Sequence, residues 1–181
     1  MIIIRQETEK DYKAVEKVTF DAFETMDIPE HPYTDEHILA RLLREDEDFV
    51  PELDLVAELE GEIVGNIMYS RCRVVRANGE KTLALVFGPL SVKPELHKKG
   101  IGRMLVERSL EIAREMGYGA VIITGHPDYY KRFGFVPARE FNLTMGDGTE
   151  IDAFMALELI EGYLGKEGGS WELCAAFQEF E

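Results

Sequence analysis

The fold is decided by residues 87–103, which read FGPLSVKPELHKKGIGR from Phe87 to Arg103. The first six of these residues end a nearly continuous apolar run over 82–92, which predicts a strand covered on both faces of a sheet. Apolar residues recur at roughly helical spacing from Ile101 onward and predict an amphipathic helix over 101–116. The sequence therefore predicts a strand, a short turn and a glycine-containing loop that opens into a helix.

The loop before this helix has the composition of an anion site. The first backbone N–H groups of a helix have no partner within it, and the helix dipole adds partial positive charge there. Gly100 and Gly102 carry no Cβ, so the backbone can come close to a ligand. The loop from His97 to Gly102 is therefore predicted to bind a phosphate or pyrophosphate.

Two other phosphate-binding patterns fail here. A dinucleotide-binding Gly-x-Gly-x-x-Gly would need glycine where the chain has Leu105, and a nucleotide-triphosphate loop would need lysine where it has Arg103. A nucleotide- or NAD-binding protein is therefore disfavoured. On the glycines alone, an ordinary loop followed by a packed helix stays open.

These residues resemble the signature of the GNAT superfamily of acyl-CoA N-acyltransferases, Gln/Arg-x-x-Gly-x-Gly/Ala, which follows the strand that carries the pantetheine. Gly100 and Gly102 match the two glycines, and Val92 lies at the family's spacing before the motif. The first motif position departs from the family, because it is His97 rather than Gln or Arg. Further on, residues 129–135 read YYKRFGF and are similar to the family's Tyr-x-x-x-Gly-Phe segment.

The resemblance covers about residues 1–159 and implies an α/β fold with a mixed, mostly antiparallel central sheet flanked by helices. The residue pattern agrees, because Asn78-Gly79 is a strong hairpin signal and the helix from Ile101 makes a crossover that should be right-handed. In the resembled fold two strands separate after a bulge, for which Gly88-Pro89 is suited because proline cannot donate to a sheet ladder. The predicted strands are 1–5, 53–60, 63–75, 81–92, 120–124 and 155–160, with a final strand 171–177 in the acidic segment 160–181.

Length and composition predict one domain over residues 1–181. The chain has a mass of 20.6 kDa, 45% hydrophobic and 30% charged residues, an ordinary globular balance. Pro29 and Pro32 predict a loop over 26–33 between two N-terminal helices. No apolar run reaches membrane-spanning length and no signal peptide is recognisable, so no membrane partner is expected. Cys72 and Cys174 lack metal-ligand spacing, which predicts a reduced, cytoplasmic protein without a metal.

The net charge of −15 is unevenly distributed along the chain. Residues 1–60 hold 18 acidic and 6 basic side chains and residues 146–181 hold 9 and 1, whereas residues 61–145 hold 8 acidic and 13 basic ones. The basic middle contains the predicted anion loop and would help to capture a coenzyme A, although each lysine could equally be ordinary solvated surface. The acidic flanks would attract a cationic amine or serve solubility alone, and the overall charge disfavours nucleic acid.

The resemblance implies transfer of an acetyl group from acetyl-CoA to a primary amine by direct attack in a ternary complex. It assigns the Leu90 N–H as the donor to the developing oxyanion and Tyr130 as the acid that protonates the departing thiolate. Tyr130 could instead be a core aromatic among its neighbours. The cofactor-binding residues that the resemblance implies are Leu90, Ser91, Val92, His97, Lys98, Lys99, Gly100, Ile101, Gly102 and Arg103.

No general base can be named from the sequence. The strand 82–92 contains no carboxylate, and Glu24, Glu58 and Glu62 resemble any surface carboxylate. Water could also relay the proton. The missing base and the histidine at position 97 leave an alternative open, an acyl-CoA-binding sensor module without transferase activity. The acceptor amine is not readable, and the resemblance alone implies a homodimer through the C-terminal strands.

Overall fold

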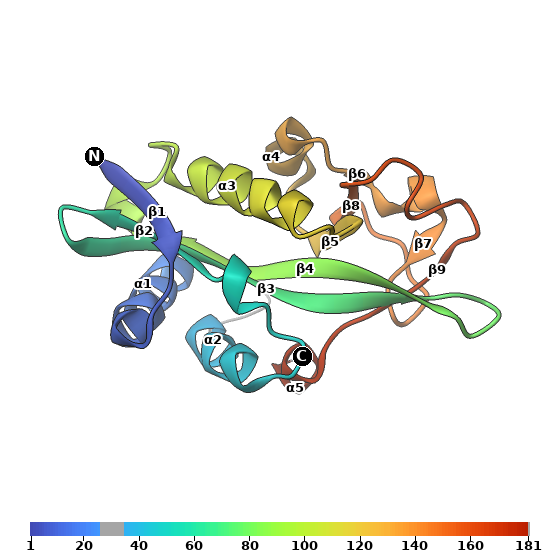
Figure 1. Cartoon of the computed structure of the whole chain (residues 1–181), viewed down its shortest axis with the longest axis horizontal. Coiled ribbons are helices and arrows are strands. Elements are labelled where there is room, and N and C mark those ends of the chain that lie inside the picture. Colours follow the sequence, from blue (N-terminus) through green and yellow to red (C-terminus); the bar gives the residue numbers. More distant parts are fainter. Residues whose placement is uncertain (26–34, 181) are drawn as a thin grey trace.

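The structure, a computed structural model, describes residues 1–25 and 35–180. In this part of the chain nine strands form one sheet in the order β1-β2-β3-β4-β5-β8-β6, and β9 and β7 are added at the far end of β3 (Figure 1). Neighbours are antiparallel except for the pairs β4–β5 and β7–β9. The predicted fold class is confirmed.

The elements have the following bounds. The strands are β1 (Ile2–Gln6), β2 (Leu55–Leu59), β3 (Glu62–Val75), β4 (Lys81–Val92), β5 (Ala120–Thr124), β6 (Val136–Pro137), β7 (Leu143–Thr144), β8 (Phe154–Glu158) and β9 (Gly169–Glu172). The helices are α1 (Tyr12–Glu24), α2 (Glu36–Glu45), α3 (Ile101–Glu115), α4 (Pro127–Tyr130) and α5 (Ala175–Phe180). The loop predicted over 26–33 lies outside the described residues.

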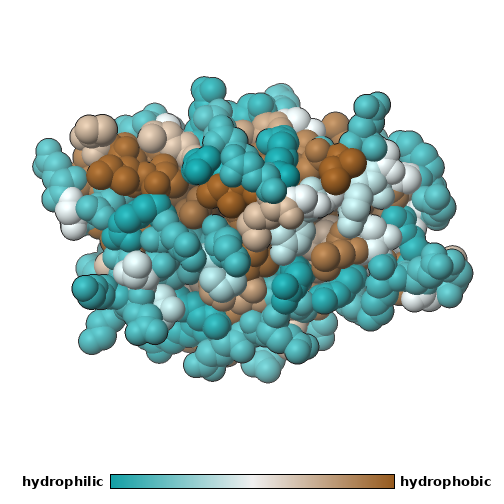
Figure 2. All heavy atoms as spheres, viewed as in Figure 1, coloured by the Kyte–Doolittle hydropathy of each residue, from teal (hydrophilic) through white to brown (hydrophobic). Residues whose placement is uncertain are grey.

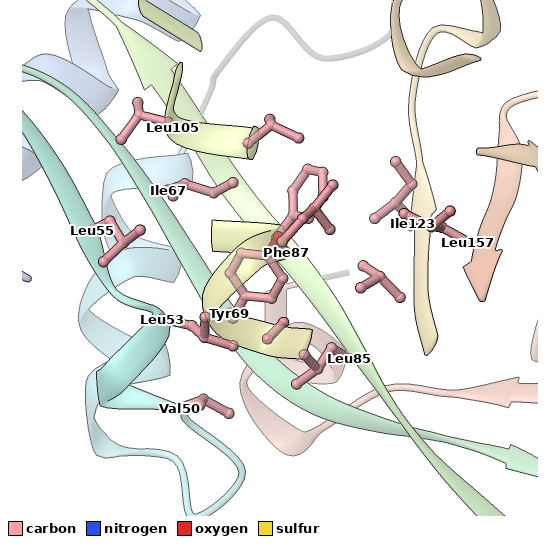
Figure 3. Packing of buried hydrophobic residues seen from close by; sticks show 14 of the residues in the cluster. Val50, Leu53, Leu55, Ile67, Tyr69, Leu85, Phe87, Leu105, Ile123 and Leu157 are labelled. Carbon is pink, nitrogen blue, oxygen red and sulfur yellow. The ribbon is translucent and has the colours of Figure 1, made fainter. Parts of the chain in front are cut away.

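The helices cover the sheet from both sides. Figure 1 shows α3 and α4 on one face and α1, α2 and α5 on the other. Ile101 and Leu105 of α3 are buried against the sheet together with Ile67 and Phe87, in the core shown in Figure 3. As its amphipathic pattern predicts, α3 packs its apolar face against the sheet.

The surface is largely polar. Figure 2 shows hydrophilic residues over most of this face, with apolar atoms gathered near β1. There Met1 is 96% and Ile3 is 51% exposed, because β1 is an edge strand. Within the described residues no helix combines the length and the apolar composition needed to cross a membrane.

The final strand predicted over 171–177 is wrong in its bounds and partly in its type. Strand β9 ends at Glu172, and Ala175 already begins the helix α5. The Asp46 carboxylate accepts a hydrogen bond from the Ala176 N–H at 2.8 Å and so satisfies a first-turn donor of α5. This partner is 130 residues away in the sequence, so no local pattern could predict the helix start.

Helices α1 and α2 lie antiparallel. Arg44, in the last turn of α2, donates to Glu16 of α1 at 3.2 Å, and Arg41 donates to the same carboxylate at 2.7 Å. At the other end, the Phe20 ring of α1 meets the His37 ring of α2 edge-on, with centroids 5.3 Å apart. The start of α2 therefore lies beside the C-terminal end of α1.

A buried pair of carboxyl groups lies beneath the opposite end of these helices. Glu7 follows β1 and Asp54 precedes β2, and the Glu7 N–H donates to the Asp54 carbonyl at 2.8 Å. Arg44 donates to both carboxylate oxygens of Glu7, at 2.7 and 3.1 Å. Asp54 forms no ion pair within the described part of the chain, although Arg44 is near enough to oppose the rise in its pKa. Burial, together with the adjacent Glu7 carboxylate, raises the pKa of Asp54 to about 10, so its carboxyl group is protonated at neutral pH.

Candidate functional site

Strand β4 contains the bulge that the sequence predicts. Leu90 lies opposite Ile67 and Phe87 opposite Tyr69, so Gly88 and Pro89 together face one residue of β3. Two residues against one is the definition of a β-bulge, which bends the strand and re-aims the residues that follow. The bulge therefore redirects the end of β4.

The backbone of Leu90 faces away from β3. In an antiparallel pair, successive residues point their N–H and C=O groups alternately toward and away from the partner strand. The Lys93 N–H donates to the Val64 carbonyl of β3 at 2.9 Å. Counting back from Lys93, the backbone N–H and C=O groups of Ser91 face β3. The backbone groups of Leu90 and Val92 face the side on which β5 lies.

The two parallel strands separate at this level. Between β4 and β5 the pairing is confined to Leu85 and Val121, near the start of both strands. Beyond this pair the described residues of β4 have no partner on the β5 side, while β5 continues its ladder with β8. A gap therefore opens between the second half of β4 and the end of β5, and the Leu90 N–H points toward it.

The ring of Tyr130 lies across the mouth of this gap. Its centroid is 5.7 Å from that of Phe87, the residue before the bulge, and 4.9 Å from that of Tyr129. On the other side, a Cβ at Gly125, directly after β5, would lie 2.2 Å from the Tyr130 ring. The Tyr130 side chain therefore both packs in the aromatic core and lies near the bulge.

The electrostatic surroundings of Tyr130 keep it protonated. Burial raises the pKa of Tyr130 well above its usual range, and the neighbouring Tyr129 adds to this. The Tyr130 hydroxyl makes no hydrogen bond to another residue among those described. A neutral phenol with a spare donor at the mouth of the gap can give a proton to a charged group that enters it.

The loop before α3 has the geometry of an anion site. Lys98 and Gly100 both have left-handed backbone angles, with φ of 62° and 85°. In the described chain, the first helical N–H that finds an acceptor belongs to Met104, which donates to the Gly100 carbonyl at 3.0 Å. The preceding N–H groups, from Ile101 to Arg103, are therefore available to a ligand at the positive end of the helix dipole.

The basic side chains near this loop are not equivalent. Arg103 is held by Glu107 at 2.7 Å and Lys93 by Glu62. Lys98 and Lys99 are exposed and have no carboxylate partner among the described residues. Of the predicted cation contacts, these two lysines are the ones free to meet a phosphate.

His97 has a structural contact that explains the departure from the motif. Its Nε2 is 2.8 Å from the Val92 carbonyl oxygen, which faces away from β3. The imidazole therefore ties the loop back to the end of β4. Its partner is a backbone carbonyl, so this contact holds the loop in place.

Sequence reasoning missed the position of Tyr129. A Cβ at Gly102 would lie 3.1 Å from the Tyr129 hydroxyl, which places this hydroxyl at the start of α3. The guanidinium of Arg132 lies 4.7 Å from the Tyr129 ring centroid. The two adjacent tyrosines of α4 have rings in contact, yet the Tyr129 hydroxyl lies at the start of α3, whereas the Tyr130 ring packs against Gly125 after β5.

The structure removes two of the three carboxylates considered as a general base. Glu58 is bonded to Arg5 at 2.8 Å, on the outer strand pair β1–β2, and Glu62 is bonded to Lys93 at the β2–β3 turn. Glu58 is separated from the gap by β3 and β4, whereas Glu62 begins β3 and is held by Lys93, the residue that follows β4. Glu24 is exposed in the last turn of α1 and has no distinguishing contact among the described residues.

Comparison with known proteins agrees with this geometry. The model of the acetyltransferase (GNAT) family matches residues 20–135, which include the bulge, the glycine loop and the two tyrosines. The chain belongs to the GNAT family of acetyltransferases. Because the family's members transfer acyl groups, the prediction of an acyltransferase enzyme is confirmed at this level.

Two relatives from Escherichia coli K12 are named as N-acetyltransferases. YhbS is 34% identical over 136 residues, which cover 74% of this chain and 79% of YhbS. YjhQ is 36% identical over 105 residues, so the matched region spans 58% of each chain.

Two crystal structures share the fold. The complex of Escherichia coli YhbS with CoA superposes with a TM-score of 0.83 at 28% identity, covering 99% of this chain and 93% of YhbS. A GNAT acetyltransferase from Brucella melitensis in complex with acetyl-CoA has a TM-score of 0.73 at 26% identity, covering 98% of both chains.

Proposed function

We propose that this protein binds acetyl-CoA in the gap between β4 and β5 and transfers its acetyl group directly to a primary amine in a ternary complex. The observation that carries the proposal is the convergence of three groups on this gap. They are the outward-facing Leu90 N–H, the protonated Tyr130 phenol and the open N-terminus of α3. The CoA and acetyl-CoA complexes of the two related proteins support the choice of donor.

In the proposed binding mode, β4 binds the pantetheine of the cofactor and the loop before α3 binds its pyrophosphate. The pantetheine runs along the edge of β4 past Leu90, Ser91 and Val92, where the outward-facing peptide groups of Leu90 and the Val92 N–H have no strand partner and can form hydrogen bonds. The pyrophosphate lies on the N–H groups at the start of α3, which requires Gly100 and Gly102 to leave room. The remaining loop residues, His97, Lys98, Lys99, Ile101 and Arg103, shape this loop or meet the phosphates.

The chemical step follows from these positions. A neutral amine attacks the thioester carbonyl carbon, a C–N bond forms and the carbonyl oxygen becomes an oxyanion, which the Leu90 N–H stabilises. The oxyanion then re-forms the carbonyl and the C–S bond breaks. Tyr130 gives its proton to the departing thiolate, and the proton lost from the amine nitrogen restores the phenol through solvent. The products are the acetylated amine and CoA.

The raised pKa of Tyr130 affects only the second half of this step. A thiol has a reference pKa of about 8.5 and a tyrosine about 10, so burial makes proton transfer to the thiolate more uphill in the empty site. A thiolate formed in the same apolar surroundings is itself poorly solvated and therefore more basic. The rise in the pKa of Tyr130 and the rise in the basicity of the thiolate offset each other, so Tyr130 can still protonate the thiolate directly.

The acceptor in this proposal is a cationic amine. The N-terminal 60 residues, which supply α1 and α2 on the face opposite α3, carry 18 acidic and 6 basic side chains. Such a field attracts ammonium groups and raises their encounter rate.

The experiment combines calorimetry with turnover. The wild type is titrated with acetyl-CoA, CoA and dephospho-CoA, and its activity is assayed with spermidine and Nα-acetyllysine. In Tyr130→Phe, we expect kcat to fall about 10²- to 10⁴-fold, as for loss of a general acid, while acetyl-CoA affinity stays. Tyr129→Phe is the matched control, since it removes an adjacent hydroxyl from the same short helix.

Each outcome is decisive. Saturable binding with turnover that depends on Tyr130 supports the transferase. Binding without transfer to either amine would instead favour a sensor module. A folded protein that binds none of the three nucleotides contradicts the proposed function altogether.

A further inference from the structure

The proposed reaction leaves one role without a residue, that of the base that removes the proton from the acceptor. An alkylammonium has a reference pKa of about 10.4, so the attacking amine must be deprotonated at neutral pH. Glu58 and Glu62 are held in ion pairs with Arg5 and Lys93. The inference below rests on the proposed function and concerns which described carboxylate reaches the bulge.

Glu36, at the start of α2, points in the direction of the sheet. Residues three and four apart share one face of a helix, and Glu36 is three residues before Leu39 and four before Ala40. Leu39 and Ala40 are 2% and 0% exposed, and they pack with Met68. Glu36 therefore continues the buried stripe of α2 by one turn and is itself half-buried.

The orientation of the helix pair places this end of α2 near the bulge. Helix α1 starts beside the buried carboxyl group of Glu7, near β1 and β2, and reaches Ser91 of β4 through Thr19, whose hydroxyl oxygen is 3.3 Å from the Ser91 hydroxyl. Because α2 is antiparallel to α1, its own start lies toward β4. Met68, beneath the middle of α2, is the residue that faces the bulge.

Position along β4 follows from helix spacing. Packed helices lie 8–10 Å apart, which corresponds to about three residues along a strand. Since α1 meets β4 at Ser91, α2 meets it about three residues earlier, at Gly88. The Phe177 ring of α5 lies on the same spot, 3.7 Å from the Cβ position of Gly88, so this face of the bulge is walled by α2 and α5.

The surroundings of Glu36 suit a group that exchanges protons near neutral pH. Burial, and to a smaller degree the neighbouring Asp35, raises the pKa of Glu36 to about 7. No cation among the described residues opposes this rise. The charged groups on the elements packed around this end of α2 are Asp35 and His37 on α2, Asp21 (bonded to Lys17) and Glu24 on α1, and Glu179 on α5.

We propose that the Glu36 carboxylate, held by α2 above the β4 bulge, is the general base that accepts the proton of the acceptor ammonium. One N–H bond of the ammonium breaks and its proton passes to a Glu36 oxygen, which leaves the nitrogen lone pair free to attack the thioester. The protonated Glu36 then returns the proton to water once product leaves. No oxidant, metal or further reactant takes part.

The test compares two nucleophiles in the wild type and four variants. Wild type, Glu36→Gln, Asp35→Asn and Glu24→Gln are assayed from pH 5.5 to 9 with spermidine and with hydroxylamine. Hydroxylamine is a far weaker base than an alkylamine, so most of it is neutral at pH 7 and needs no deprotonation. Thermal unfolding and acetyl-CoA titration report whether each variant is intact, and Glu36→Asp serves as the conservative variant.

The expected results separate the base from a structural role. For wild type, kcat/KM with spermidine should show an acid limb with an apparent pKa near 7. In Glu36→Gln, the acid limb of the pH profile should disappear and kcat with spermidine should fall about 10²- to 10⁴-fold. The rate of this variant with hydroxylamine should equal that of the wild type. Asp35→Asn should move the limb to lower pH, because a nearby negative charge is removed. Glu24→Gln should leave it in place.

Other outcomes overturn the inference in recognisable ways. If Glu36→Gln retains the spermidine rate and the limb, Glu36 is not the base, while turnover by the wild type still upholds the transferase. Equal losses with both nucleophiles would also contradict a base role, since they indicate a distorted site. Absence of transfer from wild type to either nucleophile would refute the proposed function and this inference together.

Discussion

The buried Asp54 makes a prediction about stability that can be worked out from its surroundings. Its pKa rises from 3.8 to about 10 on folding, because the carboxyl group is buried and lies against the Glu7 carboxylate. Between these two values the folded protein holds a proton that the unfolded chain has released. The unfolded state binds fewer protons, so the free energy of unfolding falls as pH rises through this window.

The perturbation is Asp54→Asn. The amide keeps the size of the side chain and can still donate a hydrogen bond to Glu7, but it holds no titrating proton. One proton linked to unfolding is worth about 1.4 kcal/mol per pH unit. From pH 5 to pH 8, the stability of the variant relative to wild type should therefore increase, by at most about 4 kcal/mol.

The assay is urea unfolding at pH 5, 6.5 and 8, with the free energy of unfolding extrapolated to water. Glu9→Gln is the matched control, since it removes one acidic charge from the same end of the molecule at an exposed position. It should shift stability by no more than a few tenths of a kcal/mol at all three pH values. If the difference between Asp54→Asn and wild type is the same at pH 5 and pH 8, the Asp54 carboxyl does not hold a proton in the folded protein and the reasoning is refuted.

Three further predictions concern the site. Gly125→Val should displace the Tyr130 ring, because this ring lies 2.2 Å from the Cβ position of residue 125. Steady-state kinetics should show that kcat falls more than the affinity for acetyl-CoA. An unchanged kcat would contradict the placement of the ring. Replacing both Lys98 and Lys99 by alanine should weaken CoA binding about tenfold at low salt and less at high salt, as measured by calorimetry, whereas a salt-independent loss would argue against a phosphate contact. Gly65→Ala should destabilise the fold by about 1–3 kcal/mol in urea unfolding, because its Cβ would lie 2.9 Å from a backbone oxygen of β4, and full stability would show that β4 can yield there.

The local part of the site could be predicted from sequence because it depends on short-range chemistry. Gly88-Pro89 interrupts a strand wherever it occurs, and Gly100 with Gly102 opens a helix start to an anion regardless of the rest of the fold. The turn at Asn78-Gly79 likewise fixes the β3–β4 hairpin from two residues. These features appear in the structure at the predicted positions.

The C-terminal segment shows why other parts could not be predicted. The residues of α5 have apolar spacing that suits a strand or a short helix, and the choice depends on Asp46 and on the surface formed by Gly88. The same holds for Tyr129 and Tyr130, which are adjacent and chemically alike. Gly102, which is far away in the sequence, leaves room for the Tyr129 hydroxyl, and Gly125 leaves room for the Tyr130 ring.

The sequence by itself indicated the family, the bulged strand and the glycine loop before α3, because each depends on a few neighbouring residues with fixed backbone requirements. The tertiary structure alone decided which carboxylates are available for chemistry. It pairs Glu58 with Arg5 on the edge strand β1 and Glu62 with Lys93 at the end of β4, and it buries Asp54 against Glu7. It also packs α2 antiparallel to α1, which sets the direction in which Glu36 faces. The same carboxyl chemistry is present at all four positions, but the pKa of each group depends on its burial and on neighbouring charges, which exist only once the chain has folded.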